Sequence, residues 1–185
     1  NQHFLLIQPH YIGQIAGKGT LVADGGTMTM TTCANTKGIT DIRVRDGGTL
    51  SMTSFTPTAG TSTISVVNGT LVSDQIVSSS GWLDIFLDGC VWEKRSASDS
   101  AIPPDNGNVS FTLGAGGMTI RPGLGKAFVI RRPIQTAAGL ERDGGITIEG
   151  ATAASSLEFG TLAQTYTGPT VLKSGTLGTR DTGAL

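Results

Sequence analysis

Two short segments of the 185-residue sequence carry side chains whose types and spacing could do chemistry. In Trp82-Leu83-Asp84 an indole ring lies two positions before a carboxylate, and in Arg131-Arg132-Pro133 two guanidinium groups precede a proline. Arg131 could act as a base on an acidic sugar if nearby carboxylates held a calcium ion. Cleavage of acidic polysaccharide is therefore the catalytic activity to test against the sequence.

Both segments match only part of the motifs of pectate-lyase-type enzymes. Those enzymes carry Trp-Ile-Asp-His and Arg-x-Pro-x-x-Arg, whereas here Ile85 follows Asp84 and Thr136 replaces the final arginine. Related hydrolases need clustered aspartates and a Gly-His-Gly, but the two histidines are His3 and His10, near the start of the chain. We therefore assign no catalytic residue and expect that the chain is not an enzyme. The alternative is a polysaccharide lyase or hydrolase that acts on acidic glycans.

Charge and composition exclude several other classes. A net charge of −1 and a pI near 6.1 give no basic surface for nucleic acid or anionic membrane. No apolar stretch approaches the roughly 18 residues of a membrane helix, so no membrane insertion is expected. Cys33 and Cys90 lack metal-ligand spacing, and no metal or cofactor is expected. The two cysteines are either one disulfide of an exported protein or two small semi-buried residues.

One phrase, an Asp-Gly or Asn-Gly pair followed by an apolar residue, returns along the chain. Its closing apolar residues are Met28, Leu50, Leu71 and Val91, at steps of 22, 21 and 20 residues. Looser copies occur at Gly116-Gly117-Met118, Asp143-Gly144-Gly145-Ile146 and Ser174-Gly175-Thr176-Leu177. A period of about twenty residues is typical of one coil of a parallel β-helix.

Apolar and polar residues alternate on both sides of each phrase, as at Ile42 and Val44 before one phrase and Leu50 and Met52 after it. This alternation places one face of each strand inside, and the Asp/Asn-Gly pair supplies the positive φ of a sharp corner. We predict an all-β fold, a right-handed parallel β-helix of about seven or eight coils, with a β-sandwich as the alternative. Its structural corners are expected at Gly26, Gly48, Gly69, Gly89, Gly117, Gly145 and Gly175.

Two segments near the C-terminus resemble a known family. Leu113-Gly114-Ala115-Gly116-Gly117-Met118-Thr119-Ile120 is followed by Thr165-Tyr166-Thr167-Gly168-Pro169-Thr170 and Ser174-Gly175-Thr176-Leu177. This pattern resembles the autotransporter-associated β-strand repeat, also called the passenger-associated transport repeat, with Pro169 in place of a second glycine. The resemblance implies a secreted or surface-anchored bacterial β-helix that serves as stalk, adhesin, biofilm component or fibre subunit. It carries no catalytic residue to transfer.

The strongest candidate contact surface is the strand before the fourth corner. If Leu83, Ile85 and Leu87 point inward, Trp82, Asp84, Phe86 and Asp88 point outward, because the opposite register would bury both aspartates. Beyond the corner, Val91 is expected to point inward and Trp92 outward. Exposed aromatic residues beside carboxylates indicate a glycan-binding or subunit contact.

Residues 93–108 form the longest non-repetitive segment and are predicted to be a protruding loop, either over the aromatic surface or free in solvent. The whole chain, residues 1–185, is predicted to be a single β-helix domain that is part of a longer protein or repeat array. Open strand edges at both ends of such a domain would permit head-to-tail polymerisation, and a glycan or host-cell-surface ligand is the other expected partner.

Overall fold

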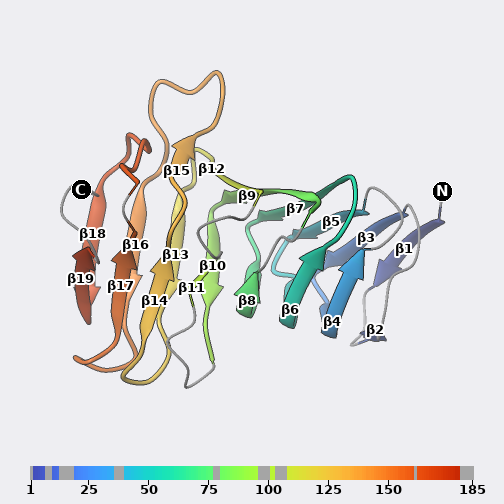
Figure 1. The fold of residues 1–185 in the computed structure, drawn as a ribbon, viewed down its shortest axis with the longest axis horizontal. Helices are drawn as coiled ribbons and strands as arrows, with labels where there is room; N and C mark the ends of the chain where they lie inside the picture. The colour runs from blue at the N-terminus through green and yellow to red at the C-terminus, as the bar shows by residue number, and fades with distance from the viewer. Residues whose placement is uncertain are drawn as a thin grey trace.

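The computed structural model describes residues 2–6, 10–12, 19–35, 40–76, 80–95, 101–102, 108–160 and 162–179. This part of the chain contains no helix and consists of parallel strands that stack into a β-solenoid (Figure 1). The predicted all-β, parallel class of fold is therefore confirmed.

Three sheets run along the solenoid. The first sheet contains β1 (Gln2–Leu6), β3 (Gly19–Asp24), β5 (Thr40–Arg45), β7 (Thr61–Val67), β9 (Trp82–Asp88), β12 (Val109–Leu113) and β15 (Ile134–Thr136). The second contains β2 (His10–Ile12), β4 (Thr27–Asn35), β6 (Thr49–Pro57), β8 (Thr70–Ile76), β10 (Cys90–Glu93), β13 (Met118–Arg121), β16 (Ile146–Glu149) and β18 (Thr170–Ser174). The third contains β11 (Ala101–Ile102), β14 (Ala127–Ile130), β17 (Ser156–Phe159) and β19 (Thr176–Thr179).

The number of coils is smaller than predicted. Seven strands of the first sheet are joined by circuits of the chain, and the solenoid makes about six turns rather than seven or eight. Counting corner phrases overestimates the turns because Ser174-Gly175-Thr176-Leu177 lies at a different corner from the others. It joins β18 of the second sheet to β19 of the third sheet, whereas the earlier phrases join the first sheet to the second.

The repeat predicts that Met28, Leu50, Leu71 and Val91 stack on one another in the core as a ladder, with one residue, or rung, from each turn. The first three rungs are confirmed, and the prediction for Val91 is wrong. Met28 pairs with Leu50, and Leu50 with Leu71, and all three are fully buried. The next rung is Trp92, because Leu71 pairs with Trp92 while Val91 pairs with Thr70. The sequence prediction aligned Asn68-Gly69 with Asp88-Gly89 and therefore placed Val91 above Leu71. In the structure Asp88 pairs with Val67 instead of Asn68, so the inward residue of the next turn is one position later.

The corners use positive φ as predicted, but not always at the predicted glycine. Gly89, Gly117, Gly145 and Gly175 have positive φ. At the three earlier corners this conformation lies one or two residues before Gly26, Gly48 and Gly69. It is found there at Gly25, at Asp46 and Gly47, and at Asn68.

Gly48 is required for a different reason, the close approach of neighbouring turns. A Cβ atom on Gly48 would collide with the carbonyl group of Ala23 and would lie 2.9 Å from the carbonyl oxygen of Arg45. One on Gly69 would lie 2.9 Å from the carbonyl oxygen of Gly48. Glycine therefore lets successive corners stack in direct backbone contact.

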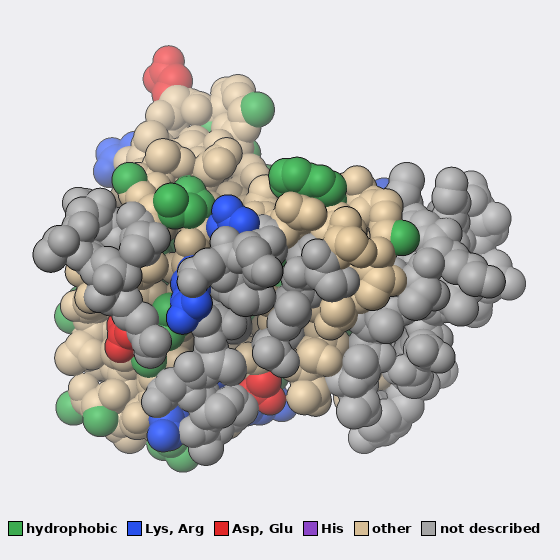
Figure 2. Space-filling model, in the orientation of Figure 1, with side chains coloured by type: hydrophobic (Ala, Val, Ile, Leu, Met, Phe, Trp, Pro, Cys, Tyr) green, Lys and Arg blue, Asp and Glu red, His purple; other side chains and the backbone are tan. Residues whose placement is uncertain are grey.

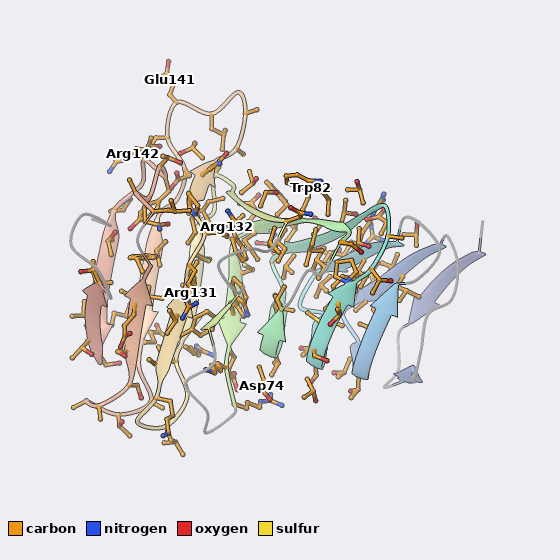
Figure 3. All side chains as sticks on the ribbon, viewed as in Figure 1. Asp74, Trp82, Arg131, Arg132, Glu141 and Arg142 are labelled. Atoms are coloured by element: carbon orange, nitrogen blue, oxygen red, sulfur yellow. The ribbon has the colours of Figure 1, made fainter. Side chains whose placement is uncertain are left out.

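Segment 93–108, for which a protruding loop is predicted, has some of its described residues in the stack. Lys94 is buried and its Nζ donates a hydrogen bond to the carbonyl oxygen of Ala127 at 3.1 Å. Strand β11 pairs in parallel with β14 and begins the third sheet. In the described part of the chain, a loop protrudes after β15, with Glu141 at its tip (Figures 1 and 3). Residues 96–100 and 103–107 lie outside the described residues.

The core is aromatic where the third sheet begins. The Trp92 ring lies 5.5 Å from Phe111 in a tilted arrangement and 5.1 Å from Phe128 in an edge-to-face arrangement. The buried indole N–H donates a hydrogen bond to Ser73 Oγ at 2.8 Å, so its polar atom is satisfied. The three rings pack against one another in the core at this level of the stack.

Candidate functional site

The outer face of β9 carries the predicted contact residues. Trp82 is 53% exposed and Asp84 is exposed, while Phe86 and Asp88 are half-buried. The alternate side chains of the strand, Leu83, Ile85 and Leu87, are buried in the core. The register predicted for this strand is therefore confirmed.

Trp92 does not belong to this surface, and its predicted outward orientation is wrong. Its side chain is 0% exposed and occupies a rung of the core ladder between Leu71 and Ile120. The prediction failed because Cys90, not Val91, is the first inward residue of β10. The aromatic part of the contact surface is thus reduced to Trp82 and Phe86.

A threonine lies beside Trp82 on the first sheet, and a carboxylate lies two residues further along the same strand face. Trp82 lies beside Thr61 of β7, and Asp84 lies between Thr63 of β7 and Ser110 of β12. Ser110 Oγ donates a hydrogen bond to Asp84 Oδ1 at 2.6 Å. Figure 2 shows hydrophobic side chains scattered among polar ones in this view, and Figure 3 places Trp82 at the surface.

This arrangement suits a ligand with one apolar face and several hydroxyl groups. The exposed indole offers a flat surface for stacking, and Asp84 retains acceptor capacity beyond its bond to Ser110. Phe86 lies four residues along the same strand face, about 13 Å from Trp82 in an extended strand. Asp88 contributes structurally, because its Oδ1 accepts a hydrogen bond from the amide of Gly116 at 2.6 Å.

The two segments considered for polysaccharide cleavage lie on different turns. Trp82 and Asp84 are on β9, whereas Arg131-Arg132-Pro133 connects β14 to β15, and β12 separates β9 from β15 in the first sheet. Within the described ranges, no group of three or more His, Cys, Asp and Glu residues could hold a metal ion.

A second feature, missed by the sequence analysis, is a ladder of alternating charge on the second sheet. Arg121 Nη2 lies 3.1 Å from Glu149 Oε2, and Lys173 Nζ lies 2.8 Å from Glu149 Oε1. Hydrogen bonds from Lys173 and then Arg121 lower the pKa of Glu149. Glu93 pairs in register with Arg121 on the preceding turn, so charges alternate along the solenoid axis. The sequence signal that could have predicted this ladder is the recurrence of opposite charges about one turn apart, at Glu93, Arg121 and Glu149.

A hollow of about 430 Å³ lies beside this ladder. Its walls combine charged side chains of β10, β13 and β16 and the residues next to them with apolar residues that follow β13 and β16. The lining residues are Glu93, Lys94, Arg95, Arg121, Pro122, Gly123, Leu124, Glu149 and Ala151. Arg95 is paired with Glu93 and Arg121 with Glu149, while Lys94 Nζ donates a hydrogen bond to the carbonyl oxygen of Ala127.

Asp143 anchors the last described turn to the one before it. This carboxylate is 4% exposed, and it accepts hydrogen bonds from the amides of Gly145, Thr167 and Gly168 at 2.8, 2.7 and 2.9 Å. Thr136 Oγ1 donates a further hydrogen bond at 2.5 Å. Burial raises the pKa of Asp143, but the hydrogen bonds from Thr136 and the three amides outweigh it, so the pKa is lowered.

The anchor gives a physical role to the Thr165-Tyr166-Thr167-Gly168 stretch. Thr167 and Gly168 supply two of the amides, and a Cβ atom on Gly168 would collide with Asp143. Tyr166 packs 6.4 Å from the ring of Phe159 and so closes the core on this side. The motif thus docks one turn onto the carboxylate of the previous corner.

The cysteines form no bridge with each other. Cys90 is a free, buried thiol, and burial raises its pKa to about 12. The backbone of Cys33 pairs with Phe55, while its side chain lies outside the described residues. The alternative of small buried residues is confirmed for Cys90.

Comparison with known proteins finds no match for the chain among family models, curated proteins or solved structures. No helix in the described residues is long and apolar enough to cross a membrane. The fold and surfaces define a parallel β-solenoid, and the resemblance to the autotransporter-associated repeat stays a prediction.

Proposed function

We propose that this chain is a structural and adhesive module of a secreted or surface-anchored bacterial protein, in which the solenoid presents a carbohydrate-binding face. The observation that carries the proposal is the exposed indole of Trp82 on a strand whose alternate side chains are fully buried. Nothing in the packing of the core requires an aromatic ring at that position. A large apolar group kept in water on a regular surface is typical of a contact site.

The regular stack supports a structural role. A side chain on the outer face of β9 is held by parallel pairing with β7 on one side and β12 on the other. Stacked turns add length without changing the cross-section, so such a body can hold a binding face away from its attachment point. We also propose that the solenoid is right-handed, as parallel crossover connections almost always are.

The surroundings of Trp82 favour a glycan over a protein partner. Exposed apolar side chains on this face are few, and they alternate with threonine, serine and aspartate, such as Thr61, Thr63 and Asp84. A sugar ring has the complementary pattern, with a C–H face for stacking and hydroxyl groups at its edge. The autotransporter-associated resemblance adds to this proposal because such proteins are exported and commonly adhesive.

Binding of the purified chain to an array of neutral and acidic glycans tests the proposal. Trp82→Ala should weaken binding at least about tenfold, the equivalent of 1.4 kcal/mol, because the stacking surface is lost. Trp82→Phe should retain part of the binding. Leu124→Ala is the matched control, because Leu124 is an exposed apolar residue in a corner after β13 and should not affect binding.

All three variants should unfold at the wild-type urea concentration, since neither side chain is in the core. Unchanged glycan binding by Trp82→Ala, or no binding by the wild type, would contradict the adhesive role. Release of unsaturated, ultraviolet-absorbing oligosaccharide from an acidic polysaccharide would instead favour the lyase alternative.

A further inference from the structure

The outer face of β9 carries a second aromatic ring in line with Trp82. Trp82, Asp84 and Phe86, here called the β9 row, occupy alternate positions, so their side chains lie on the same face of the strand. Trp82 is 53% exposed, Asp84 is exposed and Phe86 is half-buried. In an extended strand the two rings are about 13 Å apart, with the carboxylate between them. A single sugar ring is too short to reach both aromatic side chains, whereas a chain of several rings reaches them.

The strands on either side of β9 flank this row with short hydroxylated side chains. The outward residues beside it are Thr61, Thr63 and Ser65 on β7, and Ser110 and Thr112 on β12. Each of these hydroxyl groups can both donate and accept a hydrogen bond. Because the side chains are short, they line the row without closing over Trp82 or Asp84, which both stay exposed. The row is therefore an aromatic strip bordered by polar groups.

The charges on this part of the sheet disfavour an acidic ligand. β7, β9 and β12 contain no lysine or arginine, whereas Asp84 and Asp88 place two carboxylates on the outer face of β9. Arg43 on β5 and Arg131-Arg132 before β15 are each two strands away from β9, and Asp41 binds Arg43 at 2.6 Å. A ligand that lies along β9 meets carboxylates and hydroxyl groups without a cation from these three strands.

We propose that the β9 row binds an uncharged oligosaccharide of several sugar rings, which lies along the strand. The inference rests on the proposed carbohydrate-binding role of Trp82 and adds the class of glycan and its direction. One ring of the chain stacks on Trp82, and a later ring contacts Phe86. Hydroxyl groups between them donate to Asp84, whose carboxylate keeps acceptor capacity beyond its bond from Ser110. A uronic acid in the same place would bring a second carboxylate close to Asp84, and like charges side by side cost affinity.

Neutral sugars of increasing length test the role of Phe86. The probes are monosaccharides to hexasaccharides of glucose, mannose and N-acetylglucosamine, titrated into the full chain. In at least one series the wild type should bind the tetrasaccharide at least about tenfold more tightly than the monosaccharide, because only the chain reaches both rings. Phe86→Ala should remove most of this gain and leave monosaccharide binding unchanged. Phe86→Tyr keeps the ring and should retain the gain.

The ratio of the two affinities is the decisive quantity. Both affinities come from the same preparation, so a partly unfolded Phe86→Ala sample leaves their ratio unchanged. A wild type that binds chains no more tightly than monosaccharides, or a ratio that Phe86→Ala does not lower, would overturn the inference.

Uronic acid chains of the same lengths test the role of Asp84. The wild type should bind them at least about tenfold more weakly than neutral chains, because of the repulsion between carboxylates. Asp84→Asn should reduce this difference, since asparagine keeps an acceptor oxygen without the charge. Asp46→Asn removes the same charge from an exposed corner after β5 and should leave the difference unchanged. Tighter binding of the acidic chains, or equal effects of the two variants, would contradict the selectivity for uncharged glycans.

This inference and the proposed function can fail separately. If Trp82→Ala abolishes glycan binding but the wild type prefers monosaccharides or acidic chains, the adhesive role holds and the inference is wrong. If the wild type binds none of the sugars, the carbohydrate-binding role itself fails, and the inference fails with it.

Discussion

At the scale of single residues, Asp143 shows how a buried carboxylate can hold two turns together. Its two oxygens receive hydrogen bonds from a hydroxyl and three backbone amides, two of them on the following turn. These donors replace the water that the carboxylate loses on folding, so the ionised form is favoured despite burial. Asp88 plays a smaller version of this role, with one bond to the amide of Gly116.

Replacing the carboxylate should therefore destabilise the C-terminal turns. We expect Asp143→Asn to lower the free energy of unfolding by about 2–3 kcal/mol at neutral pH, since an amide NH₂ would face another donor. Urea unfolding followed by circular dichroism measures the loss. Asp46→Asn is the matched control, because Asp46 is exposed and asparagine tolerates its positive φ. Equal stability of the two variants would contradict the role given to Asp143.

The pH dependence of this effect has a definite sign. The folded-state pKa of Asp143 lies below its ordinary value of 3.8, so the unfolded chain binds the proton more readily. The stabilisation is fully present above that ordinary value and is lost as the pH falls through the lower, folded-state pKa. The difference in unfolding free energy between wild type and Asp143→Asn should thus shrink only at acid pH.

At the scale of secondary-structure elements, the corners determine which side chains meet across turns. Two different requirements for glycine occur next to each other at the corner between β5 and β6. Gly47 has a φ of +82° with no atom near the position of a Cβ, while Gly48 lies against the backbone of Ala23. Gly47 is needed because the backbone there adopts a positive φ, and Gly48 is needed because neighbouring turns come into backbone contact there.

Substituting each of these glycines by alanine should separate the two requirements. Gly47→Ala should cost roughly 1–2 kcal/mol, the penalty of a left-handed conformation for a residue with a Cβ atom. Gly48→Ala should cost about 3 kcal/mol or more, because the new methyl group meets backbone that cannot rotate away. Thermal or urea unfolding of both variants measures the difference. A larger loss for Gly47→Ala would contradict the stacking of corners.

At the scale of the whole molecule, stability is distributed along one axis. Each turn contacts the turns on either side, so a central turn is held from both sides, while an end turn is held from only one. Strand β6, for example, pairs with both β4 and β8, whereas β18 pairs with β16 alone. This arrangement gives the ends a lower local stability than the middle.

Hydrogen exchange should detect this gradient. Amides of β18 and β19 should exchange faster than those of β6 and β7, because each of the first two strands pairs on one side only in this chain and can open without disturbing the rest. Mass spectrometry of peptides after timed exchange provides the measurement. Uniform exchange along the chain would contradict the nearest-neighbour description.

Much of the fold was predictable from local pattern. Period-2 alternation and Asp/Asn-Gly pairs about twenty residues apart indicated parallel stacking, and the outward register of Trp82 and Asp84 followed from the cost of burying carboxylates. Each of these signals lies within a single strand or corner. They depend on which face of a strand is apolar and where φ must be positive, and both are properties of the local sequence.

Only the tertiary structure decided which residues of neighbouring turns meet. The burial of Trp92, the third sheet that begins at β11, the pairing of Arg121 with Glu149 and the anchor at Asp143 all depend on inter-turn register. A one-residue difference between corners changes every contact along the following strand, because alternate side chains point to opposite faces. The sequence by itself therefore determined that the chain stacks, and the packing of the turns determined which surfaces the stack presents.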